Sequence, residues 1–198
     1  GATDVALQHF EERSDGADST DRILAWDLAN VSRVSRPYLN ELFDEEVKAR
    51  VTKALDAFDA FLASPPYALL PRQLIHGDAN DENILVEGDR VAGLIDFGDT
   101  LRGAFVQDLG ITLAYAAQHG TPPNLELAAS IVSGYHDFRP LLEEEQQALF
   151  PLLRSRLATS ALIGAARRAE SPAHATRYSH EATTSRTTEA PAPITPML

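Results

Sequence analysis

Residues 74–100 read LIHGDANDENILVEGDRVAGLIDFGDT, and this stretch decides what kind of fold the chain adopts. Residues 84–86 (ILV) and 91–95 (VAGLI) are short β-prone runs, and the four residues 87–90 (EGDR) separate them. Two apolar runs at this spacing, with a glycine between them, predict a β-hairpin with a four-residue turn. Another β-prone pair, Leu74-Ile75, comes before the hairpin.

The rest of the chain predicts mainly helices. Asp44 is placed to cap a helix with apolar residues at helical spacing, and Pro65 ends it. Asp108 is interpreted as the N-cap of another helix, Pro151 predicts a break or a new first turn, and the stretch between Asp96 and Asp108 is interpreted as loop. The predicted helices cover about residues 21–28 (capped from residues 19–21), 44–62, 108–116, 125–138 and 143–170.

These elements predict a mostly helical α+β fold that carries one small hairpin, and not an alternating βαβ sheet. Residues 1–20 are short, acidic and interrupted by a glycine, which predicts a loose lead-in. Residues 21–170 are expected to form one folded lobe. Residues 171–198 are rich in Ser, Thr, Ala and Pro, which is typical of a poorly ordered tail.

The composition excludes several classes of protein. The 198 residues are 44% hydrophobic and 23% charged, which is close to the globular average. Lys and Arg total 17 against 29 Asp and Glu, and the formal charge of −12 argues against nucleic acid as a partner and suits cationic small molecules and divalent metals. Cysteine is absent, so thiolate chemistry and Cys-ligated zinc are excluded. No leader or membrane-spanning run is recognisable, so we expect no membrane partner and a cytoplasmic location.

Polar side chains are concentrated at the two ends of the hairpin. Asn83 enters the first strand and Asp96 follows the second, and the ends of a hairpin lie within roughly 5 Å of each other. Asn83 and Asp96 can therefore meet around one ion, and Mg²⁺ prefers such oxygen ligands. Asp78 precedes Asn83 by five positions, which places a third polar group beside the metal and within reach of an incoming hydroxyl.

The pattern D-x-x-x-x-N followed by D-F-G is that of the catalytic and metal-binding loops of kinases. Here His76-Gly77-Asp78 and Asn83 are followed by DFG at residues 96–98. The pair resembles the aminoglycoside phosphotransferase and choline kinase superfamily, whose fold is protein-kinase-like. HGDANDENILV, VAGLIDFGD and LAWDL at residues 24–28 are similar to its hydroxylysine-kinase-like branch, which is also found fused to class III aminotransferase domains.

The resemblance implies a role for each matched residue. Asp78 would orient the substrate hydroxyl or accept its proton, and Asn83 and Asp96 would hold Mg²⁺ against the phosphates of ATP or GTP. The supporting residues would shape or brace these loops, and they are His76, Gly77, Phe97, Gly98 and Asp108. The implied reaction is phosphate transfer to an alcohol group of a small, hydroxylated and cationic acceptor, an amine or an amino acid.

Other interpretations stand beside this one. A loop aspartate is usually a turn or cap residue, so for Asp99 and Asp108 that role is favoured over direct chemistry. His76 is expected to be structural, and Trp26 is either a core residue or part of a substrate pocket. A phosphatase of the haloacid dehalogenase type needs D-x-D-x-T, and Asp99 lies one position too late for it. A metal hydrolase would need further histidines at ligand spacing, which the sequence does not show.

The sequence also lacks motifs that a complete kinase needs. No two of its 11 glycines are separated by a single residue, and its two lysines, Lys48 and Lys53, both fall on the helix that Asp44 caps. We therefore expect a C-terminal lobe without its N-terminal lobe, inactive by itself and prone to self-association through the face left open. The alternative is a non-catalytic remnant that serves as a binding or regulatory module, docked on an aminotransferase-like partner.

Overall fold

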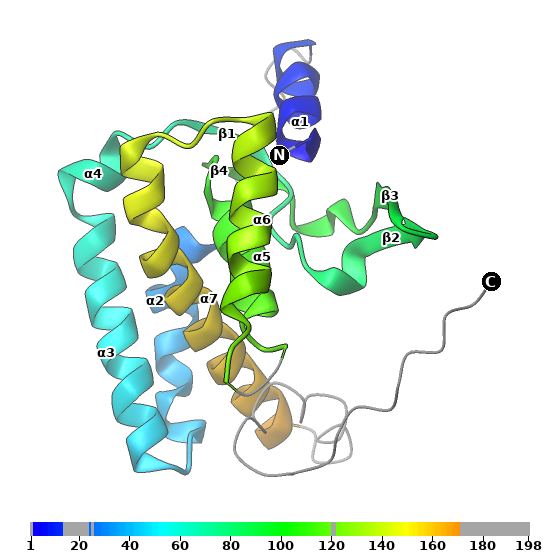
Figure 1. Cartoon of the computed structure of the whole chain (residues 1–198). Coiled ribbons are helices and arrows are strands. Elements are labelled where there is room, and N and C mark those ends of the chain that lie inside the picture. The colour runs from blue at the N-terminus through cyan, green and yellow to red at the C-terminus, as the bar shows by residue number, and fades with distance from the viewer. Residues whose placement is uncertain (1, 14–23, 25, 120–121, 171–198) are drawn as a thin grey trace.

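The computed structural model describes residues 2–13, 24, 26–119 and 122–170 (Figure 1). The predicted tail at 171–198 and the predicted cap at residues 19–21 lie outside the described residues. Helices make up most of the described chain, which confirms the mostly helical α+β character. The α-helices are α1 (Ala2–Arg13), α2 (Val31–Ser35), α3 (Glu45–Leu62), α4 (Pro65–Ala68), α5 (Gln107–Ala116), α6 (Leu125–Phe138) and α7 (Glu143–Glu170).

Short 3-10 turns and two separate pairs of antiparallel strands complete the fold. Strand β1 (Arg72–Ile75) pairs with β4 (Leu101–Ala104), and β2 (Ile84–Glu87) pairs with β3 (Arg90–Leu94). The 3-10 turns are η2 (Leu28–Asn30), η3 (Arg36–Glu41), η4 (Asp81–Asn83) and η5 (Phe97–Asp99).

The predicted hairpin is present, but its turn is shorter than predicted. Glu87 and Arg90 pair with each other, so the turn is Gly88-Asp89, with Gly88 at φ 59°. Positive φ is easily adopted by glycine, which permits the tight turn. Strand β4 falls in the stretch that the sequence indicated as loop. Its four residues form a strand because they pair with β1, which comes before the hairpin in the sequence. A local sequence pattern does not indicate a pairing between segments so far apart.

Helix α7 is the central element of the core and packs against α3 and α5 (Figure 1). Its Leu152 and Leu162 are fully buried, as is Leu55 of α3. At Gly110 of α5 a Cβ atom would lie 2.6 Å from the Leu152 Cβ, so this glycine sets how closely α5 approaches α7. Asp44 caps α3 as predicted, accepting hydrogen bonds from the backbone amides of residues 46 and 47 at 2.9 and 3.0 Å.

Three more local predictions are wrong. Helix α7 continues through Pro151, because the fully buried Ala148 and Leu152 hold the flanking turns in the core despite the missing proline N–H. Residues 24 and 26 are not helical, since the Asp27 carboxylate accepts from Ala29 N at 3.0 Å and starts η2 there.

The third wrong prediction is that residues 1–20 form a loose lead-in. Residues 2–13 form α1, because tertiary contacts with β1 stabilise a segment that its own sequence leaves weakly helical. Gln73 of β1 donates its side-chain amide to the Asp4 carbonyl at 2.9 Å, and Asp4 is buried. Throughout the part of the chain that the structure describes, no helix combines the length and apolarity needed to cross a membrane.

Candidate active site

The loop after β1 carries the HGD motif, and a carboxylate of helix α5 holds it in place. The backbone amides of His76 and Gly77 donate to Asp108 Oδ2 and Oδ1, each at 2.8 Å. Asp108 is buried in the first turn of α5, where Val106 takes the N-cap position. The Asp108 side chain therefore fixes the loop, and it does not cap its own helix as the spacing had predicted.

Gly77 has a backbone conformation that other residues rarely adopt, with φ of 83°. A Cβ atom at this position would lie 2.3 Å from the Asp99 carbonyl oxygen. The backbone of the HGD loop at Gly77 therefore passes close to η5, the turn that contains the DFG motif. Glycine is thus required here both for its dihedral angle and for its lack of a side chain.

His76 is fully buried and connects the loop to the end of the hairpin. Its Nδ1 accepts from Asp78 N at 3.3 Å, which leaves the proton on Nε2 to be donated to the Ile95 carbonyl at 3.0 Å. The Phe97 ring meets the imidazole edge-on, with the ring centroids 4.7 Å apart. These contacts give His76 a structural role between the two motifs.

Asp78 lies at the centre of a group of side-chain donors. Asn83 Nδ2 donates to the Asp78 carbonyl at 2.9 Å and to its Oδ2 at 3.2 Å, and Asn80 Nδ2 donates to Oδ2 at 2.9 Å. The other oxygen, Oδ1, is paired with Arg156. The Asp78 side chain is 20% exposed, so the carboxylate is held in one orientation while part of it still faces solvent.

Asp96 follows directly on the residue that closes the hairpin. Ile95 N donates to the Asn83 carbonyl at 2.9 Å, which joins the two ends of the hairpin through the backbone. Asp96 itself has φ of 61° and accepts from Gly98 N at 3.3 Å, so its exposed side chain begins η5. The structure thus brings Asp78 and Asn83 into contact and places Asp96 at the neighbouring end of the hairpin.

The donors at the two hairpin ends suit a hard cation. They are the amide oxygen of Asn83 and the carboxylate of Asp96, and Mg²⁺ completes such a set with water and phosphate oxygens. Within the described residues, no three His, Asp or Glu side chains form a cluster that would hold a metal by themselves. The oxygens of Asn83 and Asp96 are of the kind that a hard divalent cation such as Mg²⁺ prefers.

Arg156 is a site residue that the sequence patterns did not predict. Its side chain is 1% exposed, and Nη2 donates both to Asp78 Oδ1 and to the Tyr115 hydroxyl, the latter at 2.8 Å. Its guanidinium carbon lies 4.4 Å from the centroid of the Trp26 ring. Asp78 and Arg156 are 78 positions apart, and the available signal was a charged residue on a helix face that is otherwise buried.

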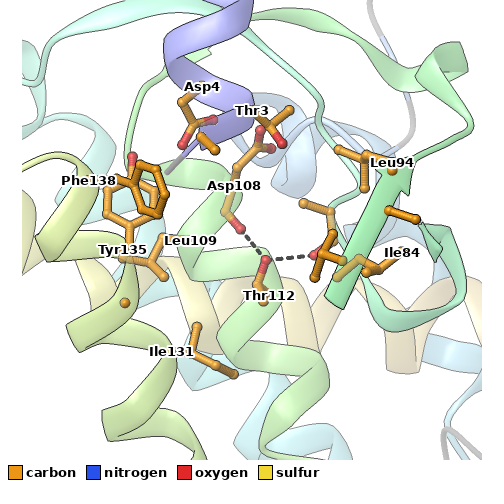
Figure 2. Close-up of a pocket in the computed structure, with 16 residues that line it drawn as sticks. Thr3, Asp4, Ile84, Leu94, Asp108, Leu109, Thr112, Ile131, Tyr135 and Phe138 are labelled. Carbon is orange, nitrogen blue, oxygen red and sulfur yellow. Dashed lines mark hydrogen bonds between the residues drawn. The ribbon is translucent and has the colours of Figure 1, made fainter. Parts of the chain in front are cut away.

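A cavity of about 410 Å³ lies behind the loop, between α1, the hairpin, α5 and α6 (Figure 2). The hydroxyl oxygen of Thr112, which lines the cavity, lies 2.6 Å from the Ala79 carbonyl oxygen and 2.9 Å from that of Asp108, so its single hydrogen is shared between them or donated to the nearer, Ala79, and it forms a second link between the loop and α5. Asp4 and Asp108 both line the cavity. Burial, together with the charge of Asp4, raises the pKa of Asp108 to about 7.

Comparison with known proteins identifies relatives of the chain. Residues 1–148 match the family model described as the phosphotransferase enzyme family. The chain is similar to a hydroxylysine kinase of Xenopus laevis, at 28% identity over 148 residues, which is 70% of this chain and 39% of the relative. A hydroxylysine kinase of Danio rerio is 26% identical over 165 residues, 81% of this chain and 45% of the relative.

A homoserine kinase of Zymomonas mobilis is 36% identical over 105 residues, 52% of this chain and 32% of the relative. The chain thus spans less than half the length of each of these three curated relatives.

Proposed function

Because this chain belongs to the phosphotransferase enzyme family, we propose that it carries the acceptor-binding and metal-binding half of a small-molecule kinase. The proposed reaction transfers the γ-phosphoryl group of ATP or GTP to a hydroxyl group. The observation that supports it most strongly is the fixed Asp78 carboxylate, which Asn80, Asn83 and Arg156 orient. Phosphoryl transfer depends mainly on such positioning and on charge stabilisation.

Asp78 is the proposed base of this reaction. Its carboxylate accepts the proton of the acceptor hydroxyl as that oxygen bonds to the γ-phosphorus, and the bond to the bridging oxygen of the nucleoside diphosphate breaks. Asn83 and Asp96 would hold Mg²⁺, which would neutralise charge on the phosphates. Asp108 of α5 holds the loop in position by accepting hydrogen bonds from two of its backbone amides, and Gly77 allows that loop to pass close to η5.

The proposed acceptor is a small hydroxylated amine or amino acid. The relatives are named as kinases of hydroxylysine and of homoserine, and both of these compounds carry a hydroxyl, an amine and a carboxylate. The formal charge of −12 favours approach of a cationic group, although net charge affects steering more than specificity.

We also propose that the nucleotide is covered by a separate lobe or fused domain, and that this chain alone does not catalyse phosphate transfer. Lys48 and Lys53 both lie on α3, and neither falls on a strand that could present a lysine to the phosphates. The exposed apolar side chains of the hairpin, including Val86 and Val91, are the proposed contact face for that lobe. The same face would serve a non-catalytic docking module, the alternative function.

A phosphate-transfer assay tests the function. The enzyme in which this chain is joined to a nucleotide-covering lobe is incubated with Mg²⁺, ATP or GTP and a panel of hydroxylated amines and amino acids. We expect one phosphorylated acceptor for each nucleoside diphosphate released. Nucleotide binding without transfer to any acceptor would contradict the kinase and favour the docking module.

A further inference from the structure

Arg156 carries a positive charge beside Asp78 that is almost completely shielded from water, since its side chain is 1% exposed. Its Nη2 is used by Asp78 and Tyr115. Nε and Nη1 have no hydrogen-bond partner among the described residues. Leaving donors of a buried guanidinium unsatisfied is costly, so this arrangement indicates that a further acceptor of hydrogen bonds belongs there.

The aromatic rings around Arg156 are already in contact with cations. The Arg156 guanidinium carbon lies 4.4 Å from the Trp26 ring centroid and 5.3 Å from that of Tyr115. The guanidinium of Arg167 also approaches Trp26, at 5.6 Å. Rings that could otherwise bind an ammonium group are therefore already occupied by guanidinium groups, so they are not available to a further cation.

We infer that Arg156 binds the carboxylate of the acceptor, so that the acceptor is a hydroxylated amino acid and not a carboxylate-free amine. The inference rests on the proposed function, which it narrows. A guanidinium presents paired N–H groups that match the two oxygens of a carboxylate. Ser160, one helical turn further along the same face of α7, has a buried hydroxyl that also lacks a partner among the described residues.

This position couples recognition to chemistry. One guanidinium contacts Asp78 and also receives the acceptor carboxylate, so the bound acceptor lies beside the group that takes its hydroxyl proton. Trp26 is half-buried and covers the guanidinium, so the carboxylate enters by shifting that ring. An interaction that serves only to orient Asp78 would not explain the unpaired Nε and Nη1 donors of Arg156.

Trp26 is the single tryptophan of the chain, so its fluorescence reports on this site directly. The chain is titrated without nucleotide with L-homoserine and with 3-aminopropan-1-ol, which is the same molecule without the carboxylate. We expect a saturable change in emission with L-homoserine and none with the amino alcohol. Arg156→Lys keeps the charge but loses the paired donors, and it should weaken L-homoserine binding at least about 10-fold.

Arg154→Lys is the matched control, because Arg154 lies on the same helix with its guanidinium 5.5 Å from the Phe150 ring. It should bind L-homoserine like the unmodified chain. A second variant, Asp78→Asn, removes the anion that competes for Arg156 and keeps the arginine. It should bind L-homoserine at least as tightly, which keeps the test decisive if circular dichroism shows that Arg156→Lys is unfolded.

Several outcomes would overturn the inference. They are equal responses to the two ligands, no saturable response to L-homoserine, unchanged binding by a folded Arg156→Lys variant, or weaker binding by Asp78→Asn. Because no nucleotide is present, these results are independent of phosphate transfer. Carboxylate-selective binding without transfer would contradict the proposed function alone, and transfer to carboxylate-free amines would contradict the inference alone.

Discussion

Asp108 accepts hydrogen bonds from the backbone amides of both His76 and Gly77, and so ties the first turn of α5 to a loop about 30 residues earlier in the chain. The carboxylate is buried and lies near Asp4 in the same cavity wall. The position of the proposed base therefore depends on an ionisable group that does not itself touch the acceptor. Protonation of Asp108, or its replacement, should therefore change how firmly the loop at His76 and Gly77 is held.

The raised pKa of Asp108 predicts a pH-dependent stability. The folded-state pKa is about 7 and the unfolded value is close to 4, so between these values the folded protein binds more protons than the unfolded chain. The contribution of Asp108 to the free energy of unfolding is therefore largest below pH 4 and decreases as the pH rises to 7, by at most about 1.4 kcal/mol per pH unit.

Urea unfolding of the unmodified chain and of Asp108→Asn, measured from pH 5 to 8, checks this sign. The free energy of unfolding of the unmodified chain, minus that of Asp108→Asn, should decrease as the pH rises to 7 and then level off. In Asp4→Asn, loss of the neighbouring charge should lower the pKa of Asp108 and move this change to lower pH. A difference that is constant, or that grows with pH, would contradict the assignment.

Gly77→Ala should destabilise the protein. The new Cβ would lie 2.3 Å from a backbone carbonyl, and positive φ costs a non-glycine residue about 1–3 kcal/mol before any clash is counted. Gly134→Ala is the control, because it lies in α6 with no atom within 4 Å of the added Cβ and should be neutral or stabilising by up to about 1 kcal/mol. Equal unfolding free energies for the two variants would show that the loop is not held as described.

The hairpin should promote self-association of the chain. Val86 and Val91 pair across β2 and β3, and each is 69% exposed. Replacing both by threonine keeps the β-branched shape but reduces the apolar surface, so sedimentation velocity should show less oligomer at the same concentration. Phe43→Ser is the control: Phe43 is 95% exposed and comes just before α3 in the chain, and Figure 1 shows α3 on the side of the molecule away from β2 and β3. Oligomerisation that responds only to Phe43→Ser would place the interface elsewhere.

Local patterns in the sequence predicted the features that local chemistry determines. The hairpin, the Asp44 cap of α3 and helices α6 and α7 each follow from a pattern within about 20 to 30 residues. The features that were missed depend on distant partners. Strand β4 forms against β1 across about 25 residues, and α1 is stabilised by β1, while Arg156 reaches Asp78 from α7. No periodicity in a single sequence encodes such contacts.

The central claim is that Asp78 acts on the acceptor while Asp96 acts through the metal, and paired kinetics of the full enzyme test it most directly. In Asp78→Asn, kcat should fall by about 10²–10⁴ while the Kd for the Mg²⁺-nucleotide stays unchanged, because the side chain keeps its size but cannot accept the proton. Asp96→Asn should instead weaken Mg²⁺-nucleotide binding. Unchanged turnover in Asp78→Asn, together with unchanged nucleotide affinity in Asp96→Asn, would contradict both assignments.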